Sequence, residues 1–193
     1  MLDGNLTEQH LVRMGIPKVH WGAAVSNLPE SCIHKEPIEK YVGSIADRVK
    51  DNCGLLLHGD YSQGKSALGS ICLKAAAAQG IIGFWIHAKE IPHHLIKETR
   101  FDDEFTVYER AISVPLLVID ELQIRQNPAY TEFSAEDLIR SRVDEEKTTI
   151  VTTNVSLDGI RTGFPALFAV MEEAVLPMKV AGHNFRTDRR RKI

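Results

Sequence analysis

Short apolar runs alternate along the chain with longer stretches in which apolar residues recur at helical spacing. Runs that are apolar on both faces are typical of buried parallel strands, and the stretches between them are typical of helices that cover such a sheet. The predicted strands are 54–58, 81–87, 115–120, 148–153 and 176–181. The predicted helices are 37–50, 65–79, 89–99, 133–146 and 166–174.

This alternation predicts a three-layer α/β/α fold, in which helices cover both faces of a five-stranded parallel sheet. Residues 1–35 are punctuated by Gly15, Pro17 and Pro29, which predicts an irregular N-terminal lead-in. Residues 36–193 are predicted to form one core domain with a basic C-terminal tail, and a length of 193 residues suits a single domain.

Charge and cysteine content exclude several classes of protein. A net charge of −3 means that any contact with DNA would need a local patch, such as the basic tail at 186–192. Cys32, Cys53 and Cys72 are odd in number and lack CxxC spacing, which disfavours a disulfide framework and a zinc site. No leader peptide is visible, and no apolar stretch approaches the roughly 20 residues that span a bilayer. We therefore expect a soluble, cytoplasmic protein.

The run GDYSQGKS follows the first predicted strand and opens the helix at 65–79, and it matches the phosphate-binding pattern G-x-x-x-x-G-K-[ST]. Glycines let the backbone turn its N–H groups toward a phosphate, and the helix N-terminus adds positive potential. Lys65 is predicted to reach the β and γ phosphates, and the Ser66 hydroxyl to bind Mg²⁺. The predicted phosphate-binding residues are Gly59, Asp60, Tyr61, Ser62, Gln63, Gly64, Lys65 and Ser66.

Polar residues end two further predicted strands. Asp120 and Glu121 follow the apolar run LLVI, and the pair favours an Mg²⁺-holding acid followed by a general base that activates water. The alternative is that Asp120 merely caps a helix. Asn154 ends the run TTIVTTN, where an amide could bind the γ-phosphate and the attacking water. By itself, this polar end is also typical of a strand that enters a turn.

In combination, these motifs resemble the AAA+ ATPases of the DnaC/IstB type, which are bacterial and phage replicative helicase loaders and transposition helper ATPases. The resemblance covers most of the chain. It rests on MGIPKVHW at 14–21, GDYSQGKS, LLVIDEL, LIRSRVDEEKTTIVTTN at 138–154 and VAGHNFR at 180–186, which occur in the order of that family.

The resemblance implies an ATPase core with sheet order 5-1-4-3-2 and little or no helical lid. It further implies that ATP and Mg²⁺ bind between subunits of a homo-oligomer, where an arginine from a neighbouring subunit completes each site. Its members act in DNA replication or transposition, so the implied partners are a replicative helicase or transposition protein and single-stranded DNA. No membrane partner is implied.

The chain departs from the family where the trans-acting arginine is expected, because residues 169–171 contain none. Arg161, in the turn upstream, is the substitute candidate. Arg142 matches a family arginine in the helix before the T-T-N strand, although a solvated helix charge would look the same. The departure leaves open a nucleotide-gated interaction protein that hydrolyses ATP poorly.

A small-molecule P-loop kinase is a further alternative, which Glu121 and the lack of an arginine-rich lid disfavour. His87, with His93 and His94, lacks a partner at metal-ligand spacing, which favours a surface or loop role over a metal site. Trp21 either packs beneath the lead-in or helps to wall an adenine pocket.

Overall fold

The computed structural model describes residues 6–30, 32–92, 106–123 and 128–181, except for the side chains of 128–134. Its strands form one parallel sheet in the order β2-β3-β4-β1-β5. This is the predicted order 5-1-4-3-2 read from the other edge, so the predicted α/β fold is confirmed. The strands are β1 (Gly54–His58), β2 (Gly83–His87), β3 (Leu116–Leu122), β4 (Thr148–Thr153) and β5 (Val175–Lys179).

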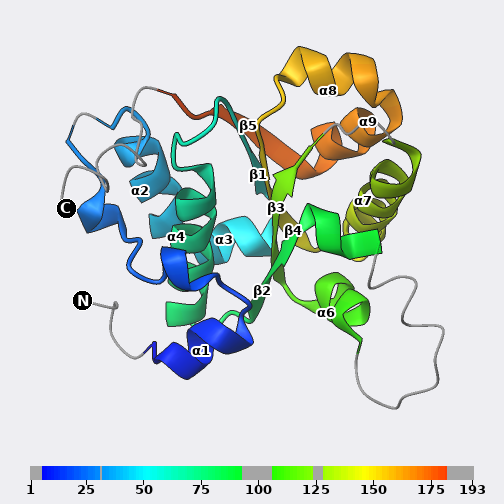
Figure 1. Ribbon diagram of the computed structural model, residues 1–193. Helices are drawn as coiled ribbons and strands as arrows, with labels where there is room; N and C mark the ends of the chain where they lie inside the picture. The colour runs from blue at the N-terminus through cyan, green and yellow to red at the C-terminus, as the bar shows by residue number, and fades with distance from the viewer. Residues whose placement is uncertain (1–5, 31, 93–105, 124–127, 182–193) are drawn as a thin grey trace.

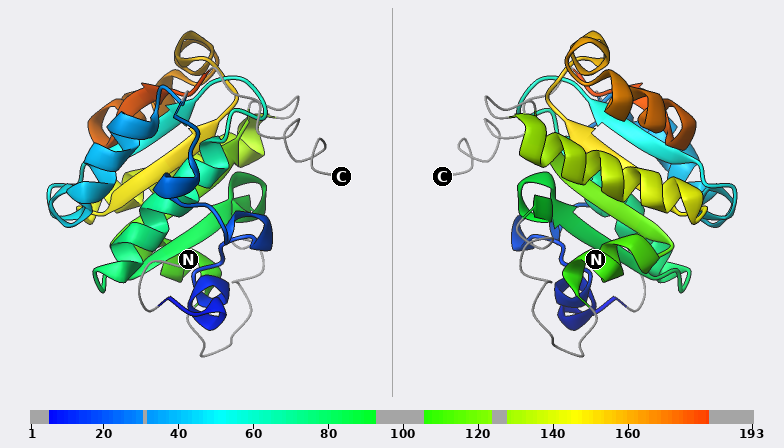
Figure 2. Two further views of the ribbon diagram at one scale, coloured as in Figure 1. Left: turned by 90° about the vertical axis from the view of Figure 1, so that its left-hand side faces the viewer. Right: turned by 90° about the vertical axis from the view of Figure 1, so that its right-hand side faces the viewer.

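Helices cover both faces of the sheet, as Figures 1 and 2 show. One layer holds α2 (Lys35–Gly43), α3 (Ile45–Lys50) and α4 (Lys65–Ala78), with the lead-in helix α1 (Glu8–Arg13) beside it. The other layer holds α6 (Val107–Ser113), α7 (Pro128–Asp144), α8 (Leu157–Gly163) and α9 (Pro165–Ala174). Across the described ranges, no helix has the length and apolar character needed to cross a bilayer.

Three short helices, α1, α6 and α8, were not predicted, and the predicted helix 37–50 is divided at Ser44. Each of the three begins at a Ser or Thr whose side chain accepts a backbone hydrogen bond, at Thr7, Thr106 and Ser156. Such caps stabilise helices that are too short to show apolar periodicity. The segment Ala88–Glu90 forms a 3₁₀ turn, and the rest of the helix predicted at 89–99 lies mainly outside the described residues, as does the basic tail.

Alternate strand residues contribute to two separate cores, because side chains on a strand point to opposite faces in turn. Trp85, Val118 and Ile150 belong to the core beneath α4. Their neighbours Ile86, Ile119 and Val151 belong to the core beneath α7 and α9. The residues two positions further along each strand, His87, Asp120 and Thr152, therefore lie on the α4 face.

The lead-in packs on the same α4 face. Its side chains Leu11, Met14 and Ile16 are buried in the core beneath α4. The backbone N–H of Trp85 donates to the carbonyl of Met14 at 2.8 Å, so the lead-in also covers part of the β2 edge. The indole N–H of Trp21 donates to the carbonyl of Ile16 at 2.8 Å, which favours the packing interpretation of this half-buried tryptophan.

Arg142 is completely buried, so its interpretation as a solvated helix charge is wrong. Its guanidinium makes five hydrogen bonds: to the Thr149 hydroxyl and to four backbone carbonyls, those of Ala111, Ile112, Val114 and Thr148. Three of these carbonyls lie at the C-terminal end of α6, where a cation is favoured by the helix dipole. Burial lowers the pKa of Arg142 to about 9, so the side chain stays charged at neutral pH. Arg142 thus ties α6 and α7 to β4.

We expect Arg142→Leu to lower the free energy of unfolding by about 3 kcal/mol or more, because several buried carbonyls would lose their donor. Urea denaturation measures the change. Arg140→Leu is the matched control: Arg140 lies on the same helix, is exposed and pairs only with Glu136 at 3.1 Å, so its loss should cost less than about 1 kcal/mol. Equal losses in both variants would contradict a structural role for Arg142.

Candidate nucleotide and metal site

The loop at 59–64 joins β1 to α4, and several of its residues have positive φ. Gly59, Ser62 and Gly64 all have positive φ, at 144°, 65° and 91°. A Cβ atom at Gly59 would lie 2.1 Å from the carbonyl oxygen of Val180, so only glycine fits there. Left-handed residues within such a turn direct successive N–H groups toward one point, which suits a phosphate.

Lys65 begins α4, and its side chain is buried with 6% exposure. Its ammonium donates to the carbonyls of Gly59 at 2.8 Å and Asp60 at 2.6 Å. The positive charge is therefore held against the loop itself. Burial, followed by the charges of Lys179 and Lys65, lowers the pKa of His58 at the end of β1. Lys179 and Lys65 thus both place positive charge near the end of β1, which suits an anionic ligand.

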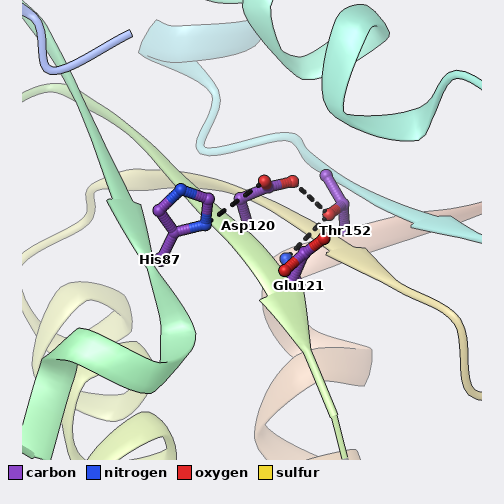
Figure 3. A network of polar contacts seen from close by, with 4 residues as sticks. All are labelled: His87, Asp120, Glu121 and Thr152. Carbon is purple, nitrogen blue, oxygen red and sulfur yellow. Dashed lines mark hydrogen bonds and ion pairs between the residues drawn. The ribbon is translucent and has the colours of Figure 1, made fainter. Parts of the chain in front are cut away.

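Asp120 and Thr152 are hydrogen-bonded at the carboxyl end of the sheet (Figure 3), and Ser66 lies near enough to Asp120 to affect its pKa. The Thr152 hydroxyl donates to Asp120 Oδ1 at 2.6 Å. Burial raises the pKa of Asp120, whereas hydrogen bonds from Thr152 and Ser66 and the nearby His87 oppose that rise. A buried carboxylate beside a hydroxyl is an oxygen donor set of the kind that Mg²⁺ prefers, so these residues fit a magnesium ion.

Glu121 adopts a left-handed backbone conformation with φ 58°, which is strained for a residue other than glycine. The register between β3 and β4 shifts at this point, as in a β-bulge. The N–H of Glu121 donates to the Thr152 hydroxyl oxygen at 3.0 Å, which holds the bulge in place. As a result the Glu121 side chain is exposed at the carboxyl end of β3, while that of Asp120 is buried.

No protein-family model and no curated protein sequence matches the chain. Solved structures do match its fold. A DnaC helicase loader superposes with a TM-score of 0.71 at 22% identity, covering 86% of this chain and 100% of that one. DnaI superposes with a TM-score of 0.67 at 16% identity, covering 87% and 93%. The chain therefore has the same fold as these two proteins.

The replication initiator DnaA, in a structure with AMPPCP and single-stranded DNA, shares this fold with a TM-score of 0.65 at 16% identity. The match covers 87% of the present chain and 51% of the DnaA chain, so the likeness is confined to about half of that protein. At these identities, all three comparisons establish the fold.

Asn154 and Arg161 both lie in the segment that follows β4. Asn154 follows β4 directly and is half-buried. Arg161 lies on α8, where its guanidinium stacks 4.8 Å from the centre of the Phe168 ring. It also lies 3.9 Å from both Asp158 and Glu172, and its side chain is 62% exposed. The predicted roles of both residues remain predictions.

Two residues in the site were not predicted from the sequence. Thr152 was treated only as part of the polar end before Asn154, yet its alternation with Ile150 could have placed it on the α4 face. His87 was predicted to have a surface or loop role. It ends β2, where the predicted strand 81–87 also ends, and it pairs in register with Asp120, with Nδ1 3.5 Å from Asp120 Oδ2. The sequence could not reveal this pair because strand register depends on long-range pairing.

We expect Thr152→Val to lower the free energy of unfolding by about 1–3 kcal/mol, because it removes the bonds to Asp120 and to the Glu121 N–H without changing side-chain size. It should also weaken nucleotide binding that depends on Mg²⁺. Thr152→Ser keeps the hydroxyl and should retain most of both properties. Urea denaturation and calorimetry measure the two effects. Equal behaviour of the Val and Ser variants would show that the hydroxyl has no such role.

Proposed function

We propose that the chain binds ATP with Mg²⁺ and hydrolyses the γ-phosphate. The observation that carries this proposal is the buried Asp120, hydrogen-bonded by Thr152 and close to Ser66, at the carboxyl end of the sheet where the loop at 59–64 leads into α4. An anion-binding loop, a buried ammonium and a buried carboxylate beside a hydroxyl are the parts needed to hold a nucleotide and its metal ion.

Each residue has a distinct part in this proposal. The loop N–H groups and Lys65 bind the phosphates, and the Lys65 ammonium exchanges its loop carbonyls for phosphate oxygens. Ser66 and Asp120 hold Mg²⁺, which neutralises phosphate charge. Glu121, exposed at the edge, accepts a proton from the attacking water. Asn154 orients that water against the γ-phosphate.

We further propose a role in DNA replication, as a helicase-loader-like factor that assembles with ATP on single-stranded DNA or on a replicative helicase. Support comes from the fold shared with a DnaC helicase loader, DnaI and a DnaA bound to single-stranded DNA. A transposition helper ATPase has the same core, so the partner protein separates these two roles. The corresponding location is the bacterial cytoplasm, whether a bacterium or a phage encodes the chain.

A nucleotide-gated interaction protein is the second candidate, and the contacts of Arg161 favour it. In the single chain, Asp158, Glu172 and the Phe168 ring all contact this guanidinium. A trans-acting arginine contributes about 10³-fold or more to the rate of hydrolysis in P-loop enzymes. If the Arg161 guanidinium keeps these contacts within α8 and α9, it does not reach a neighbouring subunit, and bound ATP will be hydrolysed slowly.

The proposal is tested by ATP hydrolysis over a wide range of protein concentration, with and without single-stranded DNA. We expect the rate per subunit to rise with protein concentration and with DNA. Glu121→Gln should lower the rate by about 10²–10⁴-fold while ATP still binds. Glu39→Gln, which changes an exposed carboxylate on α2, should leave the rate unchanged. Hydrolysis that requires a small-molecule acceptor would instead indicate a kinase.

Mixing two inactive variants separates the two candidates. In an assembly of Glu121→Gln with Arg161→Ala, one type of interface joins an intact Glu121 to an intact Arg161 from the neighbour. Recovery of activity on mixing would support Arg161 acting in trans. Tight ATP binding with near-zero turnover under every condition would support the nucleotide-gated protein.

A further inference from the structure

His87 lies inside the proposed metal site, although it is on a different strand from the predicted ligands. It ends β2 and pairs in register with Asp120 on β3. Its ring packs edge-on against Trp85, with centroids 6.4 Å apart and an interplanar angle of 84°, which restrains the imidazole. The side chain is 27% exposed overall, but its Nδ1 atom is buried and has no hydrogen-bond partner in the described structure.

The two oxygens of Asp120 have different surroundings. Oδ1 accepts the short hydrogen bond of 2.6 Å from Thr152, whereas Oδ2 lies 3.5 Å from His87 Nδ1 (Figure 3). Two donors that share one metal ion at about 2.1 Å each are about 3.0 Å apart in octahedral geometry and about 3.4 Å apart in tetrahedral geometry. The observed separation is therefore close to that of two ligands on one ion. A buried polar atom without a partner also needs an explanation, which a metal ion would supply.

We propose that His87 Nδ1 is a nitrogen ligand of the divalent ion held by Ser66 and Asp120. This inference rests on the proposed function, because it concerns the ion that accompanies the nucleotide. Mg²⁺ prefers oxygen ligands, whereas imidazole binds later first-row ions more tightly, in the order Mn²⁺, Fe²⁺, Co²⁺, Ni²⁺. His87 therefore shifts the selectivity of the site from Mg²⁺ toward ions such as Co²⁺.

The ion should bind only together with the nucleotide. Over the residues that the structure describes, no group of three or more His, Cys, Asp or Glu side chains is placed to hold a metal. Of the residues that the structure describes, the proposed ligands are the His87 nitrogen, an Asp120 oxygen and the Ser66 hydroxyl, and phosphate oxygens complete the coordination. Weak metal binding without nucleotide is thus part of the inference.

Pulsed electron paramagnetic resonance of the full chain with Mn²⁺ and a non-hydrolysable ATP analogue tests the ligation directly. We expect ¹⁴N coupling from a bound imidazole in the wild type and its loss in His87→Gln. His58→Gln is the matched control, because it removes an imidazole at the same sheet edge, from β1, and should keep the coupling. The wild-type spectrum decides the question even if His87→Gln does not fold.

Calorimetry supplies a second readout. The ratio of analogue affinity with Co²⁺ to that with Mg²⁺ should fall about 10-fold or more in His87→Gln and stay constant in His58→Gln. Analogue binding without ¹⁴N coupling, or an equal loss of affinity with both ions, would overturn the inference and leave the proposed function standing. An equal loss of analogue affinity with Co²⁺ and Mg²⁺ would indicate that His87 positions Asp120 without binding the ion. If the analogue does not bind in the presence of Mg²⁺, Mn²⁺ or Co²⁺, the proposed function fails and the inference fails with it.

Discussion

The geometry of the site depends on the two hydrogen bonds of the Thr152 hydroxyl. It donates to Asp120 Oδ1 and accepts from the N–H of Glu121, so one buried group on β4 sets the positions of two consecutive acids on β3. These acids then point to different environments, one buried beside Ser66 and one exposed at the sheet edge. The parallel pairing of β3 with β4 makes this possible, because both strands end at the same edge.

Among the described residues, Arg142 and Lys65 are buried cations whose hydrogen bonds reach different parts of the structure. Arg142 and Lys65 both donate to backbone carbonyls. The Arg142 contacts join α6, α7 and β4, so the bonds are part of the core. Lys65 donates to two carbonyls of the loop that precedes it, those of Gly59 and Asp60. In the proposed complex, phosphate oxygens replace these two carbonyls.

Much of the fold could be predicted from the sequence, because buried parallel strands are continuous apolar runs that end in polar residues. The boundaries of β1 and β4 agree with the predicted ones, and the sheet order implied by the resemblance is confirmed. The short helices α1, α6 and α8 were missed because six or seven residues are too few to show an apolar period. The buried contacts of Arg142 and the pairing of His87 with Asp120 could not be predicted for a different reason: their partners lie on other elements, and local pattern carries no information about register.

In the proposed complex, the carboxyl ends of β1, β3 and β4 hold a nucleotide and its divalent ion. A crystal structure with a non-hydrolysable ATP analogue and Mn²⁺, with the ion located from its anomalous scattering, tests this claim most directly. The account predicts phosphates within the loop at 59–66, contacts from Lys65 to their oxygens, and the ion beside Ser66 and Asp120. An analogue bound elsewhere, or an ion remote from Asp120, would contradict it.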